Sequence, residues 1–449
     1  MLNYNLDPVI EKIRANKYVN VAIQSSDVKE SADVCTYLQE KFSTTPNTNF
    51  YVIGDVLIGS CCTDIIASRR CNADYIIYLG EFCQSSIEVT VPISYVYNIV
   101  EFDSDFLSNK VETLLKDLDY TKLLLVYNAA LHHRLPEICK TLLKLATHIY
   151  VAQCFDDNAR HDAIGSRKQL AGRPVYKYII DDSSCATILG EYELETNTND
   201  ILILFLNISG GCDGLRDTIA LETSGCQYYE LLVDSGDVLN LDGYGDKLRI
   251  NRYKNIEKVK GASKIGIITL TKCLSGINRL RSEMHNLLKK SNKKCYVFSI
   301  NHLTEAKLTN FPAIDIYCLL SCSHTALTLP AILSKHLVLP FELLVALGVI
   351  DWSVDYVFDF NILLKFIYAH AIIPDSGESD NDKEKSEIKK ICGGTELSLY
   401  AKNFYDNLPH NKDRTFSGLD PLYNFDKESK IIRGSHGTAS GYSHEYTHK

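Results

Sequence analysis

The sequence lacks a long uninterrupted hydrophobic run. Its longest apolar tract, "LTLPAILSKHLVLPFELLVALGVIDW" at 327–352, is broken by Lys335, His336 and two prolines. Such a tract predicts buried helices and loops rather than a membrane span. The N-terminal stretch "MLNYNLDPVIEKIRANKY" is polar and charged, and it contains no apolar core of a signal peptide. We therefore expect a cytoplasmic protein that does not associate with membranes.

The sequence also lacks an excess of positive charge. It has 47 Lys and Arg against 56 Asp and Glu, which gives a formal net charge of -9 at pH 7. This balance makes nucleic acids and anionic membranes poor partners. No Walker, G-x-S-x-G or H-E-x-x-H motif is present, so no common catalytic signature indicates the chemistry.

What the chain does contain is a regular alternation of short apolar runs with helical patterns. Runs rich in Val, Ile and Tyr, such as "NFYVIGD" and "DYIIYLG", indicate parallel strands covered on both faces. The order of elements predicts an α/β fold of three related small parallel-sheet domains with flanking helices, plus a C-terminal extension. The predicted domains are 1–104, 105–255 and 256–372, followed by 373–449 with a charged, disordered insert at 374–390.

Four of the cysteines stand where predicted strands end. Cys61 and Cys62 follow the strand in "NFYVIGD", Cys83 follows "DYIIYLG", and Cys322 ends "DIYCLLSC". Ligands of parallel α/β sheets bind at the carboxyl ends of the strands. Three strand-end loops thus each offer a thiolate, which suits a [4Fe–4S] cluster with one open iron or a zinc site with one open position.

The remaining cysteines carry weaker signals. The chain has 15 cysteines, an odd number scattered over its length, which does not indicate a disulfide framework. Cys185 and Cys212 fall in predicted loops and stay undecided between packing and ligation. The others considered are predicted to be small buried packing residues: Cys71, Cys139, Cys154, Cys273, Cys295 and Cys318.

Several motifs resemble those of a known family. "GDVLIGSCCTD" at 54–64, followed by "ADYIIYLGEFC" at 73–83, is similar to the first-domain signature of the diphthamide-synthesis radical enzymes. "AKLTNFPAIDIYCLLSC" with "LPFELLVAL" resembles their third-domain signature. "RTFSGLDP" with "GSHGTASGY" resembles the C-terminal signature of the accessory, second subunit of the eukaryotic enzyme. The chain departs from the family at Ile58, where an aromatic residue is usual, and at Ser323, where a proline is usual.

The resemblance implies a specific activity and cofactor. The eukaryotic enzymes of this family are heterodimers of two homologous subunits. With a [4Fe–4S] cluster and S-adenosylmethionine, they transfer a 3-amino-3-carboxypropyl group to a histidine of translation elongation factor two, the first step of diphthamide biosynthesis. In the accessory subunit, the resemblance assigns the cluster ligands to Cys62, Cys83 and Cys322, with Cys61 as the rival of Cys62. Because successive residues point in different directions, we expect only one of these two to reach the metal.

The same resemblance favours an accessory role over an autonomous enzyme, because nothing matches the middle cysteine of the catalytic subunit. The expected partners are a homologous catalytic subunit, an electron-donor protein and elongation factor two as the substrate. Two alternatives stay open: a cluster-free scaffold for the catalytic partner, and a zinc protein in which the thiolates serve structure.

Overall fold

The computed structural model describes most of the chain up to residue 372. It covers 3–372 apart from 44–46, 55–60, 89, 117, 147, 156–168, 181–185, 192–199, 212, 330–336 and 353–355, together with 437–438 and 441–442. The chain divides into two compact units, Met1–Asn407 and Leu408–Lys449. The insert at 374–390, the motif "RTFSGLDP", Cys185 and Cys212 lie outside the described residues. Within "GSHGTASGY", β16 (Gly437–Thr438) pairs antiparallel with β17 (Gly441–Tyr442).

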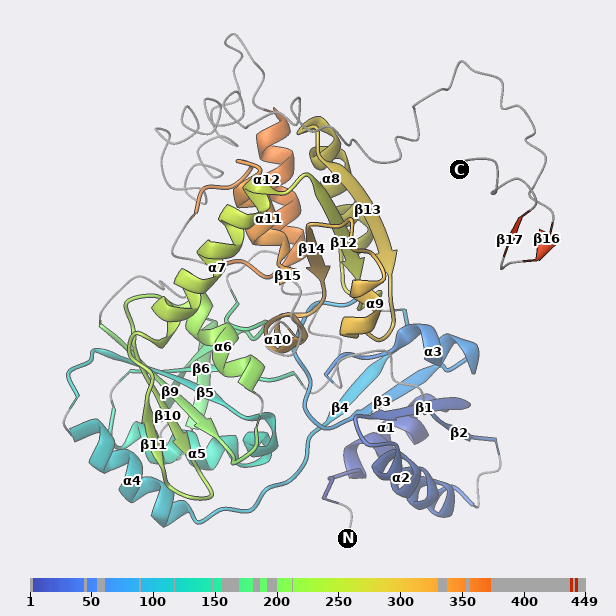
Figure 1. Cartoon of the computed structure of the whole chain (residues 1–449). Helices are drawn as coiled ribbons and strands as arrows, with labels where there is room; N and C mark the ends of the chain where they lie inside the picture. Colours follow the sequence, from blue (N-terminus) through green and yellow to red (C-terminus); the bar gives the residue numbers. More distant parts are fainter. Residues whose placement is uncertain are drawn as a thin grey trace. The chain divides into compact units, whose positions relative to one another are not determined.

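The first sheet is parallel and has four strands in the order β2-β1-β3-β4 (Figure 1). Its central strand β3 alternates between two cores: Tyr75 and Ile77 belong to one hydrophobic cluster, and Ile76 and Tyr78 belong to another. Both faces of the sheet are therefore covered, as its nearly continuous apolar runs predict. Its elements are α1 (Asp7–Asn16), β1 (Asn20–Ser25), α2 (Val28–Lys41), β2 (Asn49–Val52), α3 (Ile65–Arg70), β3 (Tyr75–Leu79) and β4 (Ile93–Val96).

The third sheet repeats the topology of the first. Its four strands are parallel in the order β13-β12-β14-β15, so in both sheets the first strand in the chain lies between the second and the third. This confirms the prediction of related parallel-sheet units. Its elements are α7 (Tyr244–Gly261), β12 (Lys264–Thr269), α8 (Ile277–Lys290), β13 (Lys294–Ser299), α9 (Glu305–Thr309), β14 (Ile316–Leu320), α10 (Ser323–Thr328), β15 (Leu337–Val338), α11 (Pro340–Ala346) and α12 (Phe360–Ile372).

The middle sheet is larger than predicted. It has seven strands in the order β11-β10-β9-β5-β6-β7-β8, and only β10, β9, β5 and β6 run parallel. Strand β11 has only three residues, too few for periodicity to reveal it, although its exposed Val238 and Leu239 are apolar. The elements are α4 (Ser104–Lys116), β5 (Lys122–Tyr127), η1 (Ala129–Arg134), α5 (Leu135–Leu143), β6 (Ile149–Ala152), β7 (Val175–Ile180), β8 (Ala186–Glu191), β9 (Ile201–Asn207), α6 (Asp213–Glu222), β10 (Gln227–Leu232) and β11 (Val238–Asn240).

The predicted domain boundaries fall close to this division but not between elements. The boundary predicted after residue 255 lies inside α7, which packs against α6 of the middle unit and α11 of the third. The boundary after residue 104 lies at the first residue of α4. These boundaries stay a prediction.

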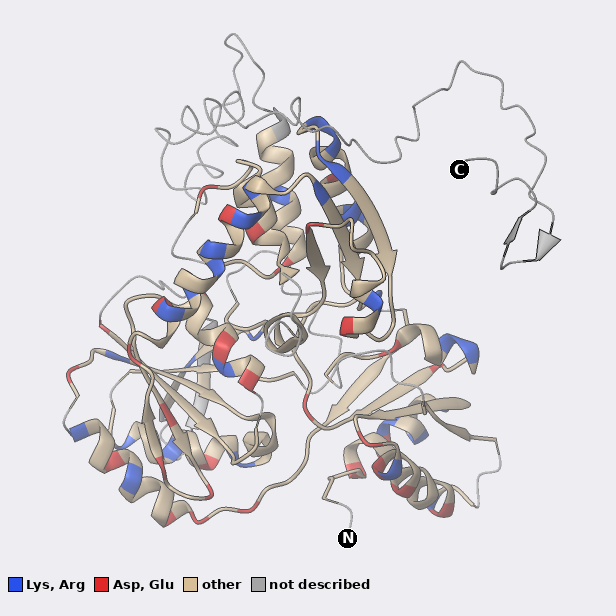
Figure 2. Ribbon diagram, viewed as in Figure 1, with Lys and Arg blue, Asp and Glu red and all other residues tan. Residues whose placement is uncertain are grey.

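Charged residues lie mainly on the helices and loops, whereas the strands contain few of them (Figure 2). Acidic and basic residues occur together on α2 and α4, whereas α7 is mainly basic. Among the described segments, no helix combines the length and the apolar character that crossing a bilayer needs.

Candidate metal centre

Four cysteine thiols form one buried group. The sulfur atoms of Cys61, Cys62, Cys83 and Cys322 all lie within 4.8 Å of one another. The Sγ atoms of Cys61 and Cys322 are 3.5 Å apart, and those of Cys62 and Cys83 are also 3.5 Å apart. All four side chains are buried, with exposed fractions of 9% or less. The sequence prediction that these strand-end cysteines converge is therefore confirmed.

Two sheets position the four thiols. Cys61 and Cys62 follow β2, and Cys83 follows β3, so both loops leave the carboxyl edge of the first sheet. Cys322 follows β14, the corresponding strand of the third sheet, and is the N-cap residue of α10. The first and third sheets thus meet at their carboxyl edges, which is where parallel α/β sheets bind ligands.

A buried glutamine holds the loop that carries the two adjacent cysteines. Gln24, near the end of β1, is fully buried; its Nε2 donates to the carbonyl of Cys62 at 2.9 Å and its Oε1 accepts from the backbone N–H of Asp64 at 2.8 Å. The backbone N–H of Cys83 donates to the carbonyl of Cys61 at 3.1 Å and ties the two loops together. Sequence reasoning missed Gln24, although a polar residue in an apolar strand is the signal that could have revealed it.

A threonine hydroxyl contacts the third-sheet end of the group. The sulfur of Cys322 lies 3.2 Å from Oγ1 of Thr325, and the sulfur of Cys61 lies 3.8 Å from the same oxygen. Thr325 lies in the first turn of α10, three positions after Cys322, which places both side chains on one face of the helix end. The hydroxyl thereby links the thiols of the two sheets.

The expectation that only one of the adjacent cysteines reaches the metal stays a prediction, but both side chains point to the same group. Both sulfurs belong to the group, and they lie 4.0 Å apart. Strict alternation of side chains applies to extended strands, but Cys61 and Cys62 lie in a turn and a bend. Both side chains can therefore leave the backbone toward one side.

The pKa values of the grouped thiols are shifted in opposite directions. The pKa of Cys322 is held well below its usual value, chiefly because the thiol of Cys61 donates a hydrogen bond to the Cys322 thiolate. The pKa values of Cys61 and Cys62 are raised well above the usual value, first because of the same interaction with Cys322. A metal ion binds thiolates. Its binding would therefore release the protons that Cys61 and Cys62 hold in this structure.

The donor set fits a soft metal. A single tetrahedral ion with metal–sulfur bonds of about 2.3 Å places its four sulfurs about 3.8 Å apart, close to the distances in this group. Iron–sulfur clusters are also held by cysteine thiolates, with each thiolate on a different iron in a [4Fe–4S] cluster, so the sulfurs then stand further apart. Four buried thiols fit either occupant chemically.

The cysteines predicted to serve packing stay outside the group. Cys139, Cys154 and Cys318 are buried in the hydrophobic core, with exposed fractions of 1% or less. Cys71, Cys273 and Cys295 are half-buried and pack against the same core. None of these six is among the four thiols that converge.

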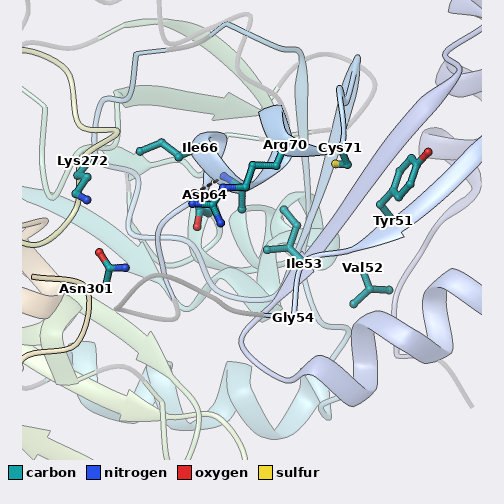
Figure 3. A pocket seen from close by; sticks show the side chains of 11 residues that line it. Tyr51, Val52, Ile53, Gly54, Asp64, Ile66, Arg70, Cys71, Lys272 and Asn301 are labelled. Atoms are coloured by element: carbon teal, nitrogen blue, oxygen red, sulfur yellow. Dashed lines mark hydrogen bonds between the residues drawn. The ribbon is translucent and has the colours of Figure 1, made fainter.

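A separate pocket opens on the outer side of the cysteine loop (Figure 3). Its volume is about 360 Å³, and it lies where β2, β12 and β13 end. Asp64 connects it to the metal centre: this buried residue follows the cysteine pair and caps α3 by accepting from the N–H of Ala67 at 2.9 Å. Arg70 and Lys272 add exposed positive charge to the pocket rim.

The fold and the thiol group together define an α/β protein with four buried cysteine thiols, able to hold a metal ion, at the carboxyl edges of two parallel sheets. The model of the diphthamide synthesis protein family matches residues 27–357. The chain therefore belongs to the diphthamide synthesis family, as the sequence motifs indicated.

Curated relatives carry the name of one subunit of an enzyme. The chain is 22% identical to 2-(3-amino-3-carboxypropyl)histidine synthase subunit 2 of Danio rerio, over 99% of this chain and 92% of the relative. It is 25% identical to the subunit 2 protein of Candida glabrata, over 92% of this chain and 77% of the relative. The match to the subunit 2 proteins thus extends over nearly the full chain.

A solved structure shares the fold. The crystal structure of Dph2 from Pyrococcus horikoshii with a 4Fe-4S cluster superimposes with a TM-score of 0.55 at 18% identity. The similarity covers 79% of this chain and 93% of the archaeal chain. At this level of identity, the likeness supports the arrangement of sheets and helices.

Proposed function

We propose that this chain is the accessory subunit of the complex that transfers a 3-amino-3-carboxypropyl group from S-adenosylmethionine to a histidine of translation elongation factor two. The observation that carries the proposal is the convergence of four buried thiols at the site where the family motifs place cluster ligands. The names of the relatives support the same reaction and the same subunit.

In this proposal, Cys62, Cys83 and Cys322 are metal ligands, and Cys61 is close enough to serve as a fourth. A [4Fe–4S] cluster held there would supply one-electron chemistry. The chain's own contribution is to bury the thiols, to fix their loops through Gln24 and to keep Thr325 beside Cys322. Burial and hydrogen bonding around the sulfurs are the means by which a protein sets the potential of such a centre.

The proposed role is to support reduction of the catalytic subunit's cluster. The chain would form a heterodimer with a homologous catalytic subunit and receive electrons from an electron-donor protein. Elongation factor two would be the substrate of the complex in the cytoplasm. The chain itself would not carry out the transfer.

One observation favours a second candidate. Mutual sulfur distances of at most 4.8 Å suit a single zinc ion better than a cluster whose irons separate the thiolates. In that case the ion would join the first and third sheets, and the chain would act as a structural partner of the catalytic subunit.

Metal analysis of the anaerobically purified chain separates these candidates. Iron and acid-labile sulfide in similar amounts, with the visible absorption of a cluster, support the accessory redox role. One zinc per chain supports the structural role, and a chain without metal supports a scaffold without a metal centre. Adding a catalytic homologue and elongation factor two then tests whether transfer of the aminocarboxypropyl group needs both chains.

A further inference from the structure

The middle sheet contributes a buried arginine beside the loops that carry the thiols. Arg173 closes a tight turn that begins at Leu170 and leads into β7. The backbone groups of Leu170 and Arg173 exchange two hydrogen bonds, of 2.9 and 3.0 Å. The two residues between them have positive φ angles, 50° at Ala171 and 75° at Gly172, which is the conformation of a type I′ turn. A non-glycine residue at positive φ is strained, and such strain gathers at functional sites.

This turn packs directly against the loop that carries Cys83. A Cβ atom added to Gly172 would lie 2.4 Å from the carbonyl oxygen of Gln84, the residue that follows Cys83. Only glycine allows this approach of the two backbones. The position of Arg173 is therefore fixed relative to a thiol-bearing loop of another sheet.

The guanidinium of Arg173 is buried, and two of its nitrogens donate no hydrogen bond to any described residue. The residue has an exposed fraction of 0%; its Nη1 donates to the carbonyl of Tyr127 at 2.6 Å, and its Cζ lies 5.6 Å from the centre of the Tyr127 ring. Among the described residues, Nε and Nη2 have no hydrogen-bond partner. A buried cation whose donors are unsatisfied is costly, so the arrangement favours negative charge nearby.

The guanidinium of Arg173 interacts electrostatically with residues on two loops of the thiol group. One is Glu81, two positions before Cys83, and the other is His324, two positions after Cys322. The side chain of Arg173 therefore faces both the first-sheet and the third-sheet part of the group.

We propose that Arg173 is a positioning residue of the metal centre, whose guanidinium balances the negative charge that the thiolates carry once a metal is bound. The inference rests on the proposed metal centre and adds the middle sheet to it. A metal held by four thiolates is a buried anion in the case of zinc as well as of an iron–sulfur cluster, and a fixed buried cation stabilises it. A reduced cluster carries one more negative charge, so this cation favours the reduced form.

The test compares Arg173→Gln and Arg173→Lys in the full chain, with Arg249→Gln as the control. Arg249 is also buried, but it donates to the carbonyls of Ala220 and Leu221 at the end of α6. The first measurement is the midpoint potential of the cluster, by anaerobic redox titration. We expect a more negative potential in Arg173→Gln, and parental values in Arg173→Lys and Arg249→Gln. If Arg173→Gln does not fold, Arg173→Met gives the same comparison without burying an amide.

The second measurement is the rate at which a chelator removes the metal, which also applies if the occupant is zinc. We expect Arg173→Gln to release the metal about tenfold faster than the parent protein. A folded Arg173→Gln with the parental potential and release rate would overturn this inference alone. A parent protein that binds no metal would overturn the metal centre itself, and the inference with it.

Discussion

The sulfur of Cys61 lies 3.5 Å from the sulfur of Cys322, although 261 positions in the sequence separate the two residues. No local motif produces this contact. It arises because the first and third sheets share one strand order and present the same edge to each other. The candidate metal centre is therefore a property of the assembled domains rather than of any single domain.

Replacing Cys62, Cys83 or Cys322 should lower the metal content. In Cys62→Ser, Cys83→Ser and Cys322→Ser, a hard hydroxyl replaces a soft thiolate, so we expect each purified variant to hold less iron or zinc than the parent. Elemental analysis of anaerobically purified protein measures this. Cys61→Ser decides the number of ligands: a loss equal to that of Cys62→Ser indicates four, and full retention indicates three.

Cysteines outside the group provide the controls for that series. Cys71→Ser and Cys295→Ser should keep the parental metal content, because neither thiol belongs to the group. Cys318 is the most closely matched control, since it is fully buried in β14, four positions before Cys322. Equal metal loss in Cys318→Ser and Cys322→Ser would mean that destabilised folding, rather than ligation, explains the effect.

Removing the side-chain amide of Gln24 should loosen the cysteine loop. Gln24→Leu leaves the carbonyl of Cys62 and the N–H of Asp64 buried without partners, at a cost of about 1–3 kcal/mol in the free energy of unfolding. We expect lower stability in urea unfolding and reduced metal retention. Asn20→Ala, at the opposite end of β1, should alter stability without altering metal content, because Asn20 bonds to Asn72 far from the thiols.

Substituting Gly172 should be more harmful than substituting a glycine of the same conformation elsewhere. Gly172 and Gly210 have φ angles of 75° and 76°, but a Cβ at Gly210 would meet nothing within 4 Å. Gly210→Ala should therefore cost only the backbone term of about 1–2 kcal/mol. Gly172→Ala must also displace Gln84, so we expect a larger loss of stability and a lower metal content. Equal effects of the two substitutions would show that the turn does not press on the Cys83 loop.

The crossing of α6 and α10 should be equally sensitive to a methyl group. A Cβ at Gly214 would lie 2.8 Å from Cα of His324, so Gly214→Ala pushes away the helix that follows Cys322. We expect a cost of about 1–3 kcal/mol from overpacking, together with weaker metal retention. Gly261→Ala, at the end of α7, meets no atom within 4 Å and should be neutral or slightly stabilising. Thermal unfolding of both variants, with and without metal, gives the comparison.

The accessory role predicts inactivity of the isolated chain. Alone, it should not modify elongation factor two; with a catalytic homologue, it should form a heterodimer whose buried interface has at least the standard size of a stable complex. Size-exclusion chromatography and a transfer assay with labelled S-adenosylmethionine test the two statements. Robust transfer by the single chain would refute the accessory assignment.

The sequence was sufficient to predict the parallel sheets and the convergence of the cysteines, because both follow from periodicity and from the chemistry of strand ends. The sequence did not reveal strand β11, because three residues are too few to show a strand periodicity. The paired orientation of Cys61 and Cys62 depends on a turn, to which strand alternation does not apply. Arg173 gave no signal, because only the tertiary contact of Gly172 with Gln84 places its turn against the Cys83 loop.

The distance in sequence between the two halves of the centre has a consequence for how the protein matures. During synthesis, N-terminal domains fold first, so the Cys61, Cys62 and Cys83 loops form while Cys322 is still untranslated. A nascent chain can thus offer only part of the thiol group, and the metal must be inserted after the third sheet has been made. Closing a loop of 261 residues costs about 5 kcal/mol of chain entropy, which domain packing must supply before insertion. Until the third sheet has folded, the thiols of Cys61, Cys62 and Cys83 should therefore lack their cover and be open to oxidation.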